Sequence, residues 1–153
     1  MGEPAIGYPA QVIVARHPRL LMLEQLWHSK RGIRWAPRKR DMDPLDMVVW
    51  LGNLMVVAAL DDGNDFLCRL YGTNLVQLFG RELTGRRVSS LSGAERNRFQ
   101  GRLRSVLSER RPRHFRFEFR RGRHAFSVAE LILPLTDDGE TVSHLLIGAY
   151  PSP

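Results

Sequence analysis

A strict alternation of aromatic and charged residues constrains the fold more than any other feature of this chain. Residues 114–121 read HFRFEFRR, so three phenylalanines alternate with charged side chains. Because successive side chains of a strand point to opposite faces, this pattern predicts a half-buried antiparallel strand. Apolar segments at 124–135 and 142–150 follow, separated by the turn sequence TDDGE. Together the three segments predict an antiparallel meander.

A second pair of apolar segments precedes the meander. NLMVVAAL at 53–60 and FLCRLY at 66–71 flank Asp62-Gly63, a dipeptide typical of tight turns between strands. These segments predict a β-hairpin, which brings the expected number of strands to five.

Two helices are expected between the hairpin and the meander. Thr73 or Asn74 can cap a short helix that Gly80 stops. Residues 92–112 then predict the longest helix of the domain body, with Ser92 and Glu95 at capping-box spacing and Pro112 at its end. Its apolar positions recur at helical intervals, namely at Phe99, Leu103, Val106 and Leu107.

Residues 1–42 divide into two parts. Residues 1–16 carry glycine and proline without a clear period and predict a loose N-terminal arm. Residues 17–42 predict a helix and a linker, because Pro18 suits a first helical position and Gly32 suits a helix end. Residues 43–153 predict the main domain, which would open with a short helix capped by Asp43 and started by Pro44.

The order of these elements predicts an α+β fold with one five-stranded antiparallel sheet and helices that cover a sheet face. A chain of 153 residues suits one domain. Its single cysteine, Cys68, excludes an internal disulfide and a cysteine-based zinc site. No apolar run approaches the ~18 residues that span a membrane. With no signal peptide evident, a cytoplasmic protein is expected.

The connector between hairpin and long helix resembles the PAS domain family. The residues that carry this resemblance stand in the family's order, namely Asn74, Leu78, Gly80, Glu82, Leu83 and Gly85. Residues 17–150 also resemble a narrower bacterial family of short stand-alone PAS proteins. The matching pieces there are Trp27, Arg31-Gly32, Pro37-Arg38, Asp41-x-Asp43-Pro44 and FLCRLYGT at 66–73.

The resemblance implies a non-enzymatic sensory or regulatory module that acts in signal transduction by sensing a small ligand, by binding a partner protein, or by both. It implies a PAS fold with the helical connector on one sheet face and an N-terminal helix outside the body. No fixed ligand follows from it. A partner signalling protein is expected, its identity open.

The PAS resemblance also implies a cavity between the sheet and the connector. The residues expected to wall it are Val56 (or Leu54), Cys68, Tyr71, Leu75, Phe79, Phe117 and Phe126. Large apolar side chains could equally fill this space. The same resemblance implies a homodimer formed through the N-terminal helix, with Leu20, Leu23, Leu26 and Trp27 as anchors.

The sequence favours no cofactor, metal or catalytic centre. Haem and flavin are not expected, because no histidine lies between residues 72 and 110 and Cys68 lies on a strand. The glycines from Gly72 to Gly85 match neither phosphate-binding fingerprint. Glu130 interrupts an apolar strand, and we expect it to face outward; the alternative is an inward carboxylate partnered by Arg69.

Charge is concentrated in one region of the chain. The net charge is +7, and residues 81–123 contain fourteen arginines and four glutamates. This region supports an alternative function as a basic nucleic-acid-associated protein. We expect the arginines of this region to form a solvent-exposed face of the protein, so nucleic acid is not expected as a partner.

Overall fold

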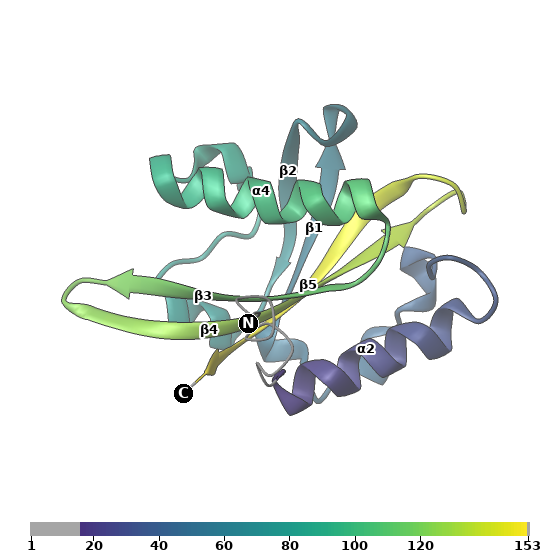
Figure 1. Cartoon of the computed structure of the whole chain (residues 1–153), viewed down its shortest axis with the longest axis horizontal. Helices are drawn as coiled ribbons and strands as arrows, with labels where there is room; N and C mark the ends of the chain where they lie inside the picture. Colours follow the sequence, from purple (N-terminus) through teal and green to yellow (C-terminus); the bar gives the residue numbers. More distant parts are fainter. Residues whose placement is uncertain (1–15, 153) are drawn as a thin grey trace, which may run out of the picture.

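One antiparallel sheet of five strands organises the molecule. The computed structural model describes residues 16–152, and the strands lie in the order β2-β1-β5-β4-β3 (Figure 1). The first and last strands in chain order therefore pair at the centre of the sheet. The strand bounds are β1 Leu54–Leu60, β2 Asp65–Tyr71, β3 Arg113–Arg121, β4 His124–Thr136 and β5 Val142–Ser152.

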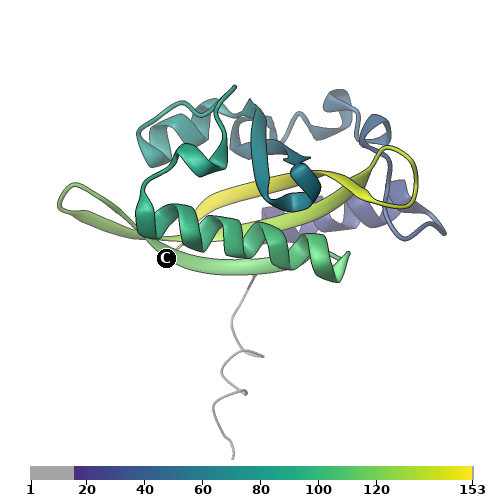
Figure 2. The same ribbon diagram turned by 90° about the horizontal axis from the view of Figure 1, so that it is seen from above.

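Helices lie on both faces of this sheet. Helix α4 (Gly93–Glu109) packs on one face, and helix α2 (Pro18–Arg31) packs on the other (Figures 1 and 2). The short helix α3 (Thr73–Phe79) joins β2 to the segment that leads into α4. The predicted hairpin, connector, long helix and meander are all confirmed, and with them the α+β PAS-type arrangement.

The core has two layers because β4 is buried on both faces. Val128 and Ile132 belong to the layer under α4, whereas Leu131 and Leu133 belong to the layer under α2. Successive side chains of a strand alternate between faces. A strand covered on both faces therefore reads as a continuous apolar run, and this explains the sequence LILPL.

Helix α2 is attached to the sheet of its own chain. Leu20, Leu23 and Trp27 are almost fully buried, and the Trp27 indole Nε1 donates a hydrogen bond to the carbonyl of Pro134 at 2.9 Å. Leu26 is partly buried against the same layer. The structure therefore corrects the expectation that these four residues face a second copy, because the helix needs its apolar face to cover its own sheet.

The predicted short helix at residues 43–52 is a pair of 3₁₀ turns instead, η2 (Pro44–Met47) and η3 (Leu51–Asn53). Asp43 does cap the first turn, accepting a hydrogen bond from the Leu45 amide at 2.9 Å. Met47 at the end of η2 and Trp50, which precedes η3, are both buried.

Candidate ligand cavity between helix α4 and the sheet

A small cavity of about 60 Å³ lies between α4, the connector and the inner face of the sheet; we call it the inner cavity. Its walls combine apolar and aromatic side chains with three arginines and three glutamates. The lining residues are Met55, Tyr71, Leu75, Phe79, Arg81, Leu83, Glu95, Arg98, Phe99, Arg102, Phe117, Glu118, Phe119, Glu130, Ile147 and Ala149.

A buried ion pair crosses the inner cavity from helix to sheet. Arg102 Nε on α4 donates to Glu130 Oε1 on β4 at 2.7 Å, and Arg102 Nη2 lies 3.4 Å from Oε2. The Glu130 side chain is 4% exposed and that of Arg102 16%. Burial raises the pKa of Glu130, and the facing guanidinium opposes this shift. Because removing one partner of a buried pair leaves an unpaired charge, the pair ties α4 to β4.

Aromatic rings surround the guanidinium of Arg102. Its central carbon lies 4.0 Å from the centroid of the Phe117 ring and 5.3 Å from that of Phe99. A cation over an aromatic face is attracted by the ring quadrupole. These contacts hold the Arg102 side chain at the inner cavity. From the sequence alone, it was open whether a ligand or protein side chains fill this space.

A second ion pair lies at the mouth of the inner cavity. Arg81, which follows α3, donates to both carboxylate oxygens of Glu95 in the first turn of α4. The Arg81 Nε atom is buried and has no hydrogen-bond partner among the described residues. Nearby, burial raises the pKa of Tyr71 to about 12, although Arg81 opposes the shift.

This pairing corrects the capping box predicted for α4. Ser92 is the residue that precedes the helix, but its side chain makes no capping hydrogen bond. Glu95 turns toward Arg81 because a carboxylate binds a guanidinium through two parallel hydrogen bonds. Glu95, which was predicted to take part in the capping box, therefore joins α4 to the connector instead.

Four of the seven expected wall residues line the inner cavity: Tyr71, Leu75, Phe79 and Phe117. Val56 does not, and neither does Leu54, because both pack with the layer on the α2 side of the sheet. Met55 takes their place. A shift of one residue along a strand moves a side chain to the other face, which explains this correction.

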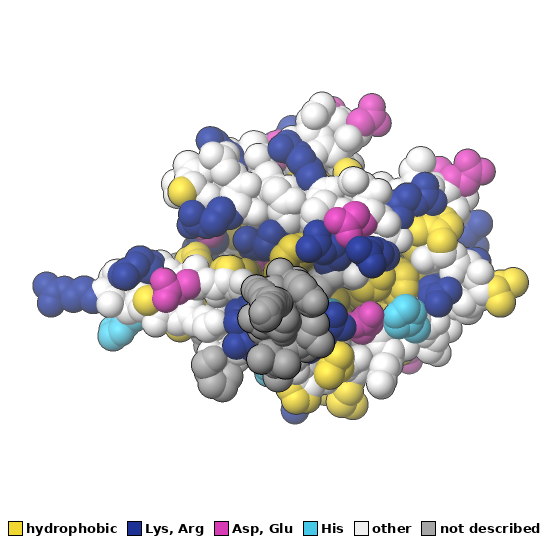
Figure 3. Space-filling view, in the orientation of Figure 1, with side chains coloured by type: hydrophobic (Ala, Val, Ile, Leu, Met, Phe, Trp, Pro, Cys, Tyr) yellow, Lys and Arg dark blue, Asp and Glu magenta, His cyan; other side chains and the backbone are white. Residues whose placement is uncertain are grey.

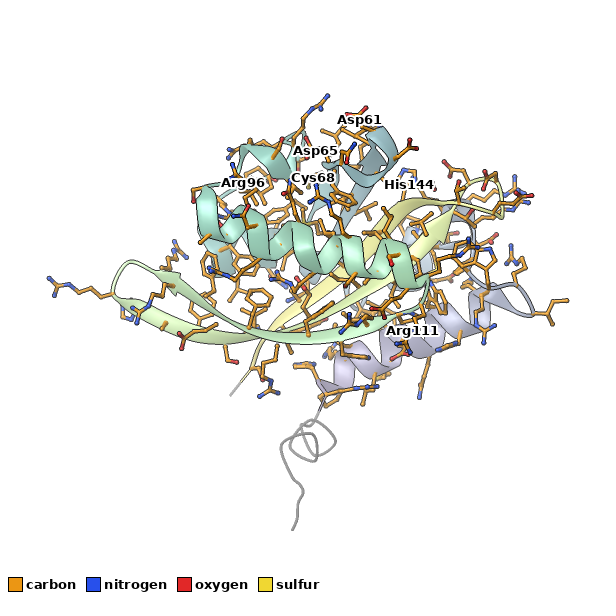
Figure 4. The ribbon with its side chains drawn as sticks, turned by 45° about the horizontal axis from the view of Figure 1, so that its top comes forward. Asp61, Asp65, Cys68, Arg96, Arg111 and His144 are labelled. Carbon is orange, nitrogen blue, oxygen red and sulfur yellow. The ribbon has the colours of Figure 1, made fainter. Side chains whose placement is uncertain are left out.

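The other two expected wall residues lie beside the inner cavity in the same core layer. Cys68 lies on β2 (Figure 4) and contacts a separate small crevice with Leu83 and Val88. Burial raises the pKa of its thiol to about 11, which suits a core residue rather than a nucleophile. Phe126 packs against Phe119, with ring centroids 5.6 Å apart.

Glu130 also departs from expectation. It points inward, toward α4, and its partner is Arg102 rather than Arg69. Arg102 and Arg81 were not singled out from the sequence, because both lie among many arginines with similar neighbours. Arg102 is three residues from Phe99, so its position beside the apolar stripe of α4 was the one available signal.

The connector is held at its start by a close backbone contact and an asparagine pair. A Cβ on Gly72 would lie 2.2 Å from the carbonyl oxygen of Gly52, so only glycine fits there. The Asn74 amide donates to Asn53 Oδ1 at 2.7 Å, and Asn53 Nδ2 donates to the Ala149 carbonyl at 3.0 Å. These contacts position α3, and with it Leu75 and Phe79, at the inner cavity.

The arginine-rich region does not form one uniform basic surface. Arg81 and Arg102 pair inside the domain, Arg113 pairs with Glu109 at 3.0 Å, and Arg121 donates to the Gln77 carbonyl. Arg96 and Arg111 lie near opposite ends of α4 (Figure 4). On the face shown in Figure 3, basic side chains are interspersed with acidic and apolar ones.

Within residues 16–152, no group of three or more histidine, cysteine or acidic side chains is arranged to hold a metal ion. In the same part of the chain, no helix has both the length and the apolar character to cross a membrane.

Comparison with known proteins identifies the family. A family model described as the PAS domain matches residues 15–150. The chain therefore belongs to the PAS domain family, as the connector residues had indicated. No curated protein matches the chain.

Solved structures share the fold at low sequence identity. A light-oxygen-voltage domain studied with a flavin analogue has a TM-score of 0.55 and 16% identity, covering 71% of this chain and 83% of that chain. The PAS domain of Bordetella pertussis BvgS has a TM-score of 0.53 and 16% identity, with coverages of 72% and 85%. The light-state LOV domain of the blue-light photoreceptor aureochrome1 has a TM-score of 0.52 and 16% identity, with coverages of 73% and 88%.

Proposed function

We propose that this chain is a sensory and regulatory module of signal transduction that catalyses no reaction of its own. Membership of the PAS family supports a sensory signalling module. The finer proposal is that a small ligand acts at the inner cavity and that the resulting change passes to a partner protein.

The observation that carries this proposal is the Arg102–Glu130 pair. It lies inside the inner cavity and joins the middle of α4 to the middle of the sheet. A cavity of about 60 Å³ holds a few water molecules, whereas typical ligand sites measure roughly 300–1,000 Å³. A ligand must therefore displace Arg102, and its entry would change how α4 is attached to β4.

A flavin does not fit this site. The inner cavity is far smaller than a flavin requires, and the buried Arg102–Glu130 pair is part of its lining. Cys68, the one cysteine, does not line it. The proposed ligand is instead a small polar molecule that competes with Arg102 for Glu130, such as an amine or amidine.

Replacing Arg102 tests whether the inner cavity accepts a ligand. Arg102→Ala leaves the Glu130 carboxylate facing an enlarged space. Millimolar methylguanidinium should then raise the unfolding temperature of Arg102→Ala, measured by circular dichroism, because it restores a cation beside Glu130. In hydrogen exchange, the same probe should restore protection to α4.

Arg104→Ala is the matched control, because Arg104 lies on the same helix but donates to the Gly63 and Asn64 carbonyls. It should not respond to methylguanidinium. If Arg102→Ala also fails to respond, or if Arg102→Ala with Glu130→Gln responds equally, the inner cavity is not a sensing site for cations and the proposal is wrong.

We also propose that the module works as a homodimer. The anchors expected from sequence are buried within the chain, so the contact would use the outward side of α2, where Leu21 and Met22 are exposed. Adjacent exposed apolar side chains such as these could form part of the larger apolar patch that marks an interface.

A further inference from the structure

A larger cavity lies on the opposite face of the sheet, the one that carries α2. Its volume is about 470 Å³, and turns η1 (Lys39–Asp41) and η2 enclose it together with strands β1 and β2. This volume falls within the range of roughly 300–1,000 Å³ that is typical of small-molecule sites. We call it the outer cavity.

The floor of the outer cavity is apolar. Helix α2 contacts β4 and β5, so the part of this sheet face over β1 and β2 is left for the turns to enclose. The apolar lining residues are Met42, Pro44, Met47, Leu51, Leu54, Val56, Leu70, Leu135 and Leu146. Such a floor favours an apolar chain, at about 25 cal/mol per Å² of apolar surface removed from water.

Three cations line the same cavity, against a single carboxylate, that of Asp43. Lys39, Arg40 and Arg69 form no ion pair or side-chain hydrogen bond with any residue of the 16–152 segment, in contrast to Arg81 and Arg102. The one acidic lining residue, Asp43, directs one carboxylate oxygen to the Leu45 amide as the cap of η2. Among residues 16–152, the lining of the outer cavity therefore carries more positive than negative charge.

Two of these cations also affect the pKa of a nearby histidine. His144 lies on β5 (Figure 4) beside Leu145 and Leu146. Burial lowers its pKa; Lys39 and Arg69 lower it further, and Asp137 opposes the shift. Lys39 from the linker and Arg69 from the sheet thus both lower the pKa of the same histidine.

We propose that the outer cavity binds an amphipathic anion, an unbranched acyl chain that ends in a carboxylate. The chain would lie on Leu54, Val56 and Leu146, and the carboxylate would meet Lys39 and Arg69. An arginine binds a carboxylate through two parallel hydrogen bonds, which favours this head group over a neutral one. The ligand would join the linker to β2 without entering the inner cavity across the sheet.

Sodium decanoate, kept below its micelle concentration, is the probe for isothermal titration against the full chain. One saturable site per chain is expected. Lys39→Ser with Arg69→Ser should weaken binding by about tenfold or more, because both charged hydrogen-bond donors to the carboxylate are lost. Decanol should bind more weakly than decanoate. Decyl phosphate distinguishes a lipid-type head group from a free carboxylate.

Two further variants separate the parts of the site. Leu70→Trp places a large ring at the rim, at a half-exposed position where folding is not at risk, and should abolish binding. Arg123→Ser, an exposed arginine in the turn between β3 and β4, is the control and should bind as the native chain does. Bound decanoate should also raise the pKa of His144, followed by nuclear magnetic resonance.

The proposal is overturned if decanoate shows no saturable binding, or if the double serine variant and Leu70→Trp bind as well as Arg123→Ser. It is likewise overturned if Arg102→Ala, rather than the outer-cavity variants, changes the affinity. A chain that doubles its mass through this surface and is indifferent to decanoate would show a second copy as the occupant.

Discussion

At the scale of single residues, the start of the connector depends on a glycine that has no space for a side chain. Gly72 approaches the backbone of Gly52 so closely that an added Cβ would overlap its carbonyl. Relief requires movement of the backbone on one side, and Asn53 and Asn74 hold both sides by hydrogen bonds.

Gly72→Ala should therefore lower the free energy of unfolding by about 1–3 kcal/mol, as overpacking does in protein interiors. Urea denaturation measures this change. Gly101→Ala is the control, because Gly101 lies in the exposed interior of α4 with open space around its Cβ position. That substitution should stabilise the chain by about 0.5–1 kcal/mol. Equal effects of the two substitutions would contradict the steric argument.

The stability of the folded chain is expected to depend on pH through His144. Its folded-state pKa is lowered from 6.5, first by burial. The unfolded chain therefore takes up a proton before the folded chain does, and stability declines as pH falls below about 6.5. His144→Gln should flatten this decline between pH 7 and pH 5, measured by thermal unfolding. An unchanged profile would show that His144 does not cause it.

At the scale of elements, helix α2 is a structural part of the domain. Its buried residues share a core layer with β4 and β5, and its tryptophan bonds the backbone of β4. Any signal that moves α2 must expose this layer, so movement of α2 has a large energetic cost.

Truncating one buried residue of α2 measures that cost. Leu23 is fully buried, and Leu23→Ala should lower the free energy of unfolding by about 2–5 kcal/mol. Gln25→Ala, at an exposed position of the same helix, should change it by less than about 0.5 kcal/mol. Similar values for both would show that α2 does not depend on its contact with the sheet.

At the scale of the whole molecule, the proposed dimer makes a prediction about mass. Sedimentation at micromolar concentration should give twice the chain mass of 17.5 kDa. Met22→Asp should shift this value toward one chain mass and leave the far-ultraviolet circular dichroism that of a folded chain, because Met22 is exposed within its own chain. A native chain that sediments as a monomer would refute the proposal.

The sequence predicted the helices and strands better than it predicted which of their side chains lie together. Alternation in HFRFEFRR, the turn at Asp62-Gly63 and the apolar stripe at Phe99, Leu103 and Val106 are local signals, and the structure confirms them. The positions of Val56 and Glu130 depend on strand register, because a shift of one residue moves a side chain to the opposite face of the sheet.

The two ion pairs of the inner cavity could not be predicted from short stretches of sequence, for a related reason. Arg102 and Glu130 are 28 residues apart, and Arg81 and Glu95 are 14 apart. Their pairing exists only once α4 lies on the sheet. The short turns at 44–53 were likewise mistaken for a helix, because an aspartate cap followed by proline starts a 3₁₀ turn as readily as an α-helix.

The central position of β5 has a consequence for how the chain folds during synthesis. Strand β5 pairs with both β1 and β4, so the hairpin of β1 and β2 has no central neighbour until the last strand leaves the ribosome. Long-range strand pairing is slow, and unpaired apolar strands are prone to aggregate. The nascent chain should therefore expose the β1 edge until β5 has been synthesised and pairs with it.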